Sequence, residues 1–154
     1  MKKRILIVHF SQSGQLNEVV RSIAGPLEES PDIDVSYEEL KPRAPYPFPW
    51  PFLQFFDTFP ETVHADPAPI QALSEQCQQD FDLVILAYQV WFLSPAQPMT
   101  AFLQCADAAR LLRDKPVITV IACRNMWLMA QENMKERLQV LGARLIDNVV
   151  LTDP

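Results

Sequence analysis

A turn rich in small polar residues follows the first apolar stretch of the chain, residues 5–10. It consists of Ser11, Gln12, Ser13, Gly14 and Gln15. Residues 16–27 then carry apolar side chains at helical spacing. Hydroxyl groups donate hydrogen bonds to anions, glycine lets the backbone curl tightly, and the start of a helix attracts negative charge. We therefore predict that this turn binds an anion; the alternative is that its serines only cap the helix.

A second group of candidate residues is aromatic. Tyr88, Trp91 and Phe92 follow one apolar stretch, and Trp127 follows another. Such side chains form flat apolar walls for a planar ring, and nearby backbone groups supply hydrogen bonds to its polar edge. The alternative is that they close the end of a sheet and pack against a neighbouring loop.

Polar candidates stand at the end of the apolar stretch 116–122. Arg124 and Asn125 are candidates for polarising a carbonyl oxygen of a substrate. For Arg124 the alternative is a surface ion pair. Cys123 is a candidate redox thiol, but no histidine neighbour is evident, and a buried spectator role is the alternative.

The surrounding elements indicate how these groups are brought together. Apolar stretches predict strands over 5–10, 34–40, 81–88, 116–122 and 143–151. Helical spacing predicts helices over 16–27, 70–79 and 130–141, the last capped by Gly142. It also predicts a helix after Pro98, which either continues or restarts through 106–112. This alternation is typical of an α/β fold with a parallel sheet covered on both faces. With the first strand central, the strand order is 2-1-3-4-5, and ligands bind beyond the carboxyl ends of strands one and three.

The first turn and its continuation resemble a known family. Residues 11–16 are similar to the T/S-x-T/S-G-x-T loop with which flavodoxins hold the phosphate of FMN, except that Leu16 lacks the final hydroxyl. Asn17 is a candidate replacement, and in related quinone reductases that position can be apolar. Residues 83–103 are similar to the stretch that holds the flavin ring in those reductases.

The chain thus resembles the flavodoxin-like superfamily, which includes flavodoxins and NAD(P)H-quinone or FMN reductases. The resemblance implies a doubly wound five-stranded sheet, FMN as cofactor and NAD(P)H as a candidate reductant. It implies contacts with FMN from Ser11, Gln12, Ser13, Gly14, Gln15, Leu16, Gln89, Val90, Trp91, Phe92, Leu93 and Cys123. The loop with Arg124 and Asn125 departs from the family, in which glycine-rich loops are usual there, so the roles of these two residues toward the substrate are predicted from their chemistry alone.

A narrower resemblance rests on the segments 41–50, 88–91 and 123–127. They look like flavodoxin-like proteins labelled dialkylresorcinol-condensing enzymes, which are longer than this chain. The label implies a role in making aromatic lipids. The fold implies redox chemistry on a quinone-like or cyclic-diketone substrate, because condensation requires an activated nucleophile and none is evident. Three functions remain open: an FMN-dependent oxidoreductase, a flavodoxin-type electron carrier, and a non-catalytic module without flavin.

An unusual insertion over 41–69 contains eight prolines and seven aromatic residues. Proline fixes an extended path, and a disordered linker would carry fewer aromatic side chains. We predict an ordered segment that packs on something apolar. The candidates are a wall or lid for an aromatic substrate, a homodimer arm through 46–59, and a satellite core on the protein's own surface.

Composition sets the remaining limits. The 154 residues fit one flavodoxin-like domain over 1–154. A net charge of −6 without a basic tract argues against nucleic acid and anionic membranes as partners, and no apolar stretch is long enough to span a membrane. Three separated cysteines and two histidines predict free thiols in a reducing cytoplasm and no metal site. Because the chain stops after the fifth strand, we expect the last helix to be missing and the chain to be the N-terminal part of a longer protein.

Overall fold

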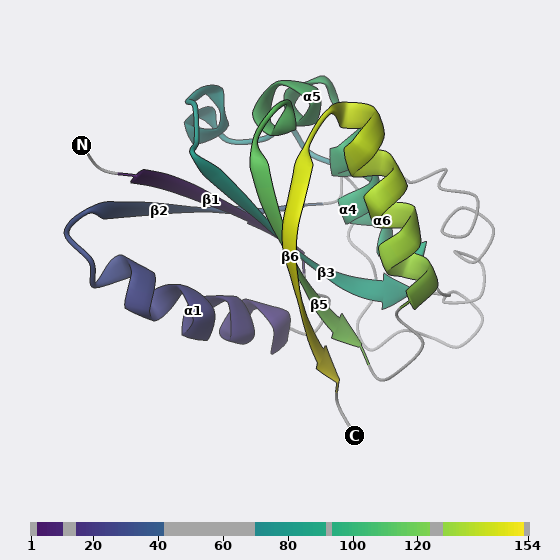
Figure 1. Cartoon of the computed structure of the whole chain (residues 1–154), viewed down its shortest axis with the longest axis horizontal. Coiled ribbons are helices and arrows are strands. Elements are labelled where there is room, and N and C mark those ends of the chain that lie inside the picture. The colour runs from purple at the N-terminus through teal and green to yellow at the C-terminus, as the bar shows by residue number, and fades with distance from the viewer. Residues whose placement is uncertain (1–2, 11–14, 42–69, 92–93, 124–127, 153–154) are drawn as a thin grey trace.

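A computed structural model describes residues 3–10, 15–41, 70–91, 94–123 and 128–152. In these ranges, five parallel strands form one sheet in the order β2-β1-β3-β5-β6 (Figure 1). Their bounds are β1 Lys3–His9, β2 Ile33–Glu39, β3 Leu83–Trp91, β5 Pro116–Cys123 and β6 Arg144–Thr152. Counted without the short strand β4, Ser94–Pro95, this is the predicted order 2-1-3-4-5, which is confirmed.

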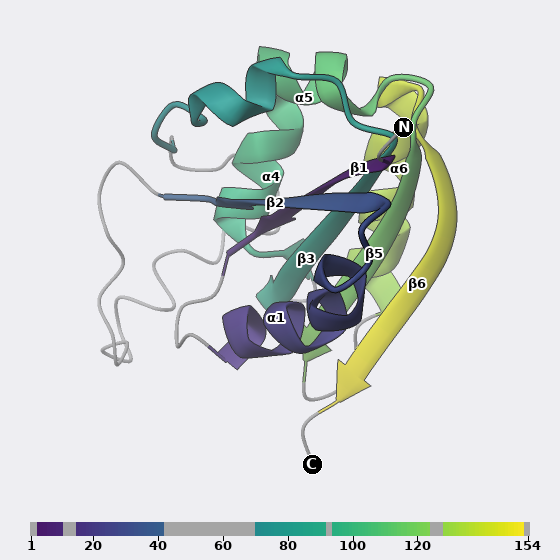
Figure 2. The same cartoon turned by 90° about the vertical axis from the view of Figure 1, so that its left-hand side faces the viewer.

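The helices cover the sheet on both faces. Helix α1, Gln15–Glu28, lies on one face, whereas α4, Gln97–Gln104, α5, Ala106–Leu112, and α6, Leu128–Leu141, lie on the other (Figure 1 and Figure 2). Of the two predictions for residues 98–112, one continuous helix or a restart at Ala106, the structure shows the restart, because Cys105 adopts an extended conformation between α4 and α5.

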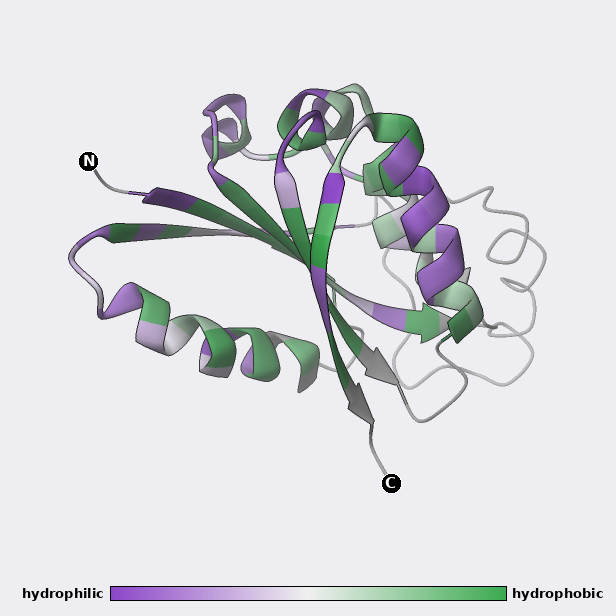
Figure 3. Cartoon of the chain, viewed as in Figure 1, coloured by the Kyte–Doolittle hydropathy of each residue, from purple (hydrophilic) through white to green (hydrophobic). Residues whose placement is uncertain are grey.

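Alternation along the strands divides the core into two clusters. In β1, Leu6 and Val8 pack with α4, α5 and α6, whereas Ile5 and Ile7 pack with α1. Successive side chains of a strand point to opposite faces, so a central strand covered on both sides is apolar throughout. Figure 3 shows this as nearly continuous hydrophobic colour along the central strands.

The predicted helix over 70–79 is wrong in most of its length. Only Glu75–Gln78 is helical, as a single 3-10 turn, η1. The backbone N–H of Gln71 donates to Lys41 O at 2.6 Å, and that of Ser74 donates to the Glu38 carboxylate at 3.1 Å. The N–H groups of Gln71 and Ser74 thus donate to residues at the end of β2 and not to carbonyl groups of their own segment. Residues 70–74 therefore stay extended beside the end of β2.

The predicted cap at Gly142 is confirmed. Gly142 has φ of 79°, and the N–H groups of Gly142 and Ala143 donate to Gln139 O at 3.1 Å and Leu138 O at 2.9 Å. This pair of hydrogen bonds is a Schellman motif, which satisfies the last carbonyl groups of α6 and requires a left-handed residue.

Replacement of Gly142 by alanine is expected to destabilise the protein by about 1 kcal/mol, because an L side chain disfavours positive φ. A Cβ there would meet only Arg113 Cγ at 3.6 Å, an ordinary contact, so the cost comes from the backbone. Urea unfolding measures it. Glu136→Ala, at an exposed position inside α6, is the matched control, and we expect it to change the stability by no more than about 0.5 kcal/mol. Equal effects of the two changes would contradict this assignment.

Candidate cofactor site at the carboxyl edge of the sheet

The carboxyl ends of β1, β3 and β5 lie side by side. His9 at the end of β1 pairs with Ala87 in β3, and Gln89 farther along β3 pairs with Ala122 in β5. The three predicted loops leave the sheet from these ends. The fold therefore brings the three groups of candidate residues to one edge, at the point where the strand order reverses.

Most of the predicted contact residues lie outside the described part of the chain. These are Ser11, Gln12, Ser13, Gly14, Phe92, Leu93, Arg124 and Asn125. For Gln15, Trp91 and Cys123 the structure describes the backbone only: Gln15 starts α1, Trp91 ends β3 and Cys123 ends β5. The contacts of all these residues stay predictions.

Leu16, where the flavodoxin pattern has a hydroxyl, is a core residue. Its side chain is 1% exposed and belongs to the cluster formed by α1 and the sheet. It packs with Val20 one turn later and with Ile5 and Ile7 of β1. A leucine here anchors the first turn of α1 on the sheet, immediately after the serine-rich turn, and presents no polar side-chain atom to a ligand.

The second predicted loop is a β-hairpin. Strand β3 continues past Tyr88, its predicted end, to Trp91, and the chain returns as β4 with Val90 opposite Pro95. The N–H of Ala96 donates to Gln89 O at 2.8 Å, and α4 begins at the next residue. Gln89 and Val90 are half-buried in this hairpin. Pro95 is tolerated in β4 because a proline on an edge strand leaves no ladder bond unmade.

Buried polar side chains connect the hairpin with α6 and the sheet. Tyr88 Oη donates to Gln131 Oε1 at 2.6 Å, and Gln131 Nε2 donates to Thr119 Oγ1 at 3.2 Å. Thr119 Oγ1 donates to Asn148 Oδ1 at 2.7 Å. Tyr88, Thr119 and Gln131 are each 2% exposed or less. Sequence reasoning missed Gln131, Thr119 and Asn148, because isolated polar residues in a helix and two strands give no signal of contact.

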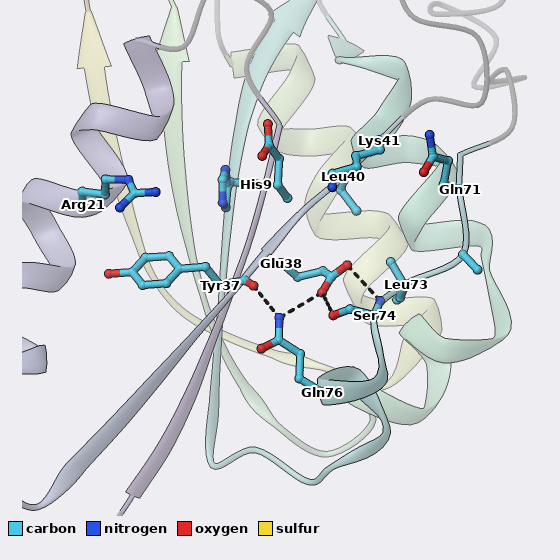
Figure 4. A pocket seen from close by; sticks show the side chains of 12 residues that line it. His9, Arg21, Tyr37, Glu38, Leu40, Lys41, Gln71, Leu73, Ser74 and Gln76 are labelled. Carbon is cyan, nitrogen blue, oxygen red and sulfur yellow. Dashed lines mark hydrogen bonds between the residues drawn. The ribbon is translucent and has the colours of Figure 1, made fainter.

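A cavity of about 380 Å³ lies beside the ends of β1 and β2 (Figure 4). The Arg21 guanidinium lies 5.8 Å from the centre of the Tyr37 ring, and the His9 ring meets the same ring edge-on at 6.5 Å. The Tyr37 hydroxyl donates to the Glu28 carboxylate. Burial, with the hydrogen bond and charge of Glu28, raises the pKa of Tyr37 to about 12, so this phenol stays protonated at neutral pH.

The wall of this cavity contains a buried carboxylate. Glu38 is 7% exposed and accepts hydrogen bonds from Ser74 N at 3.1 Å, Gln76 Nε2 at 3.0 Å and the Ser74 hydroxyl. Burial acts to raise the pKa of Glu38, but hydrogen bonds from Ser74, Gln76 and Cys77 outweigh it and hold the pKa below its usual value. Figure 4 shows this group joining the end of β2 to residues 74–76. Glu38 therefore acts as a structural clamp.

Cys77 and Cys105 are not activated thiols. Burial and the charge of Glu38 raise the pKa of Cys77 to about 12. Burial also raises the pKa of Cys105. A thiol with a raised pKa carries little thiolate at neutral pH and is a poor nucleophile. Across the described ranges, no three His, Cys, Asp or Glu side chains gather as metal ligands would, and none of the helices there is long and apolar enough to cross a membrane.

Comparison with known proteins finds a similar arrangement of strands and helices in flavoproteins. No protein-family model and no curated protein sequence matches the chain. A flavoprotein from Lactobacillus acidophilus, solved in complex with FMN, matches with a TM-score of 0.72 and 18% identity over 96% of this chain and 93% of that one. The apo form of the flavoprotein from that organism gives 0.62 and 17% identity over 97% and 93%.

A flavodoxin is similar at a greater distance. Oxidised flavodoxin 1 from Bacillus cereus matches with a TM-score of 0.58 and 16% identity, over 99% of this chain and 87% of that one. Together with the strand order and the helices on both faces, these likenesses establish the architecture. The chain has the flavodoxin-like fold.

Proposed function

We propose that this protein is an FMN-binding oxidoreductase. The observation that carries the proposal is the meeting of the ends of β1, β3 and β5 at the switch point of the sheet, with α1 starting directly after a serine–glycine turn. A helix start of this kind favours a phosphate, and the hairpin next to it carries the aromatic residues. A flavoprotein with the same fold binds FMN, which supports the choice of ligand.

The residues present fit such a cofactor. Ser11 and Ser13 would donate hydroxyl hydrogen bonds to its phosphate, and Gly14 would let the backbone approach it. The hairpin residues 89–93 would hold the ring, and Cys123 would contact its polar edge. When bound, FMN supplies the capacity to accept or donate a hydride. Arg124 and Asn125 would orient the substrate and polarise its carbonyl oxygen.

The same proposal includes the substrate class, the reductant, the biosynthetic role and the cellular location. The proposed substrate is quinone-like or a cyclic diketone, because the aromatic side chains of Trp91 and Phe92 would suit a planar ring, and NAD(P)H is the proposed reductant. We further propose a role in dialkylresorcinol-type aromatic lipid synthesis and a cytoplasmic location. We also propose that the protein forms a homodimer through residues 46–59. We also propose that residues 41–69 form an insertion in a domain over 1–154.

Titration with FMN, followed by quenching of flavin fluorescence, tests the cofactor assignment. We expect the wild-type protein to bind FMN, and the Ser11→Ala/Ser13→Ala variant to bind about 10–100-fold more weakly, because two hydrogen bonds to a charged phosphate are lost. Ser22→Ala on the exposed surface of α1 is the matched control and should bind as the wild type does. Absence of FMN binding in the wild-type protein would overturn the proposal and leave a non-catalytic module.

Turnover distinguishes the remaining functions. Oxidation of NAD(P)H coupled to reduction of a quinone supports the oxidoreductase. Reversible one-electron reduction of the bound flavin without turnover supports an electron carrier instead. The same protein preparation serves for both measurements.

A further inference from the structure

The side chain of Gln131 joins two elements that lead into the proposed flavin site. It lies in the first turn of α6, directly after residues 124–127, and is 2% exposed. The buried residues of α6 are Ala130, Gln131, Met134 and Leu138, so Gln131 is the one polar residue on the buried face of this helix within the described range 128–141.

Both ends of the Gln131 amide are used. Its oxygen accepts from Tyr88 at 2.6 Å, one residue before the flavin-loop candidates begin at Gln89. Its nitrogen donates to Thr119 at 3.2 Å, four residues before Cys123 in β5. Thr119 Oγ1 in turn donates to Asn148 Oδ1, in the edge strand β6, at 2.7 Å. The three hydrogen bonds therefore run in one direction, Tyr88 to Gln131 to Thr119 to Asn148, and each strengthens the next.

Directional contacts of this kind constrain α6 more narrowly than apolar packing does. Apolar contacts between a helix and a sheet have no preferred direction, whereas hydrogen bonds weaken steeply with distance and angle. Leaving either end of a buried amide unpaired is costly, so the amide holds α6 at one position relative to β3 and β5. In the described part of the chain, every buried side-chain nitrogen and oxygen has a partner, so this arrangement is complete.

We infer that Gln131 is a positioning residue for the proposed flavin site. It sets the separation between the β3–β4 hairpin, which leads to residues 92–93, and the start of α6, which leads from residues 124–127. A planar ring inserted between two loops tolerates little change in their spacing, because a small displacement removes contacts on one side. The inference rests on the proposed function, and it adds a residue remote from the cofactor that determines how tightly the ring is held.

Gln131→Leu tests the inference, since leucine keeps an apolar volume in the core and removes both hydrogen bonds. We expect the dissociation constant for FMN to rise about tenfold. Leu138→Ala, on the same face of α6 two turns away, is the control for lost stability, and its dissociation constant should stay within twofold of wild type. Both variants are measured at a temperature where circular dichroism shows them folded, and Gln131→Met replaces Gln131→Leu if the latter does not fold.

A second measurement does not depend on FMN. The Ala96 amide closes the hairpin by donating to Gln89 O, and the Leu40 amide makes an equivalent bond to His9 O at 2.8 Å on the other side of the sheet. In Gln131→Leu we expect hydrogen exchange at Ala96 to accelerate about tenfold relative to Leu40. Thr119→Ser, which keeps the hydroxyl, should leave both readouts near wild type, whereas Thr119→Val should shift them toward Gln131→Leu.

The outcomes separate the inference from the proposed function. If the wild-type protein binds FMN and Gln131→Leu binds it equally well, the positioning role is wrong and the FMN assignment stands. If the wild-type protein does not bind FMN, the proposed function fails, and the exchange ratio of Ala96 to Leu40 decides whether Gln131 positions the hairpin. An unchanged ratio would overturn the inference in either case.

Discussion

Phe102→Ala is expected to lower the free energy of unfolding by about 3–5 kcal/mol, the largest effect of any single change considered for this protein. Phe102 is fully buried in α4, in the cluster that also contains Leu86 and Tyr88 of β3. Its removal leaves a cavity where helix and sheet meet, because the surrounding side chains relax only in part. Urea unfolding followed by circular dichroism, with the slope of the transition checked for constancy, measures the loss.

Phe102→Leu is the control for this prediction. It keeps most of the side-chain volume, and we expect it to cost less than half as much as alanine. A loss below about 1 kcal/mol for Phe102→Ala would mean that α4 does not pack on the sheet as the structure shows. Since α4 follows directly on the β3–β4 hairpin, we also expect Phe102→Ala to weaken FMN binding through the same displacement.

Glu38→Ala is expected to destabilise the protein by about 2–3 kcal/mol at neutral pH, because hydrogen bonds to a buried carboxylate are lost and their donors on Ser74 and Gln76 remain. Glu38→Gln keeps the shape and one acceptor oxygen, so it should cost about half as much. Asp34→Ala, an exposed carboxylate on the same strand, is the matched control, and we expect a change within about 0.5 kcal/mol.

The contribution of Glu38 also depends on pH, with a definite sign. Folding lowers the pKa of this carboxyl, so the folded state binds its proton less readily than the unfolded state does. The stabilisation is therefore fully present above the ordinary glutamate pKa of about 4.3 and is lost as pH falls through the lower pKa of the folded state. The stability difference between wild type and Glu38→Gln should shrink below about pH 4. A difference that grows on acidification would show that the carboxylate is not the clamp.

Local patterns were sufficient for the framework of the fold. Apolar runs such as 81–88 and 116–122 predicted central strands, because a parallel strand covered on both faces needs apolar residues throughout. Alternation of strands and helices then predicted a parallel sheet, and a central first strand predicted the doubly wound order 2-1-3-4-5. The glycine at position 142 predicted the cap at the end of α6, because glycine adopts the left-handed conformation of such a cap more readily than other residues do.

Local patterns failed where a distant partner decided the conformation. Residues 70–74 lack the predicted helix because Lys41 and Glu38, 30 and 36 positions earlier in the chain, accept hydrogen bonds from the N–H groups of Gln71 and Ser74. Strand β3 runs past Tyr88 because the hairpin and α6 supply partners there, although prolines follow. The serine-rich turn, the hairpin tip and Arg124 could be proposed from sequence as site residues, and their contacts stay predictions.

By itself the sequence determined the five parallel strands, the helices that cover them, and their order, because apolar periodicity and turn residues act over a few neighbouring positions. The strand order in turn gave the edge at which the candidate residues meet. The tertiary structure alone decided that Leu16 is a core anchor, that Glu38 is a clamp, and that Gln131 joins Tyr88 to Thr119. Tyr88 and Gln131 are 43 positions apart in the sequence. Their hydrogen bond forms because packing of α6 on the sheet brings the two side chains together and excludes water from both. This packing depends on the whole fold and not on neighbouring residues in the sequence.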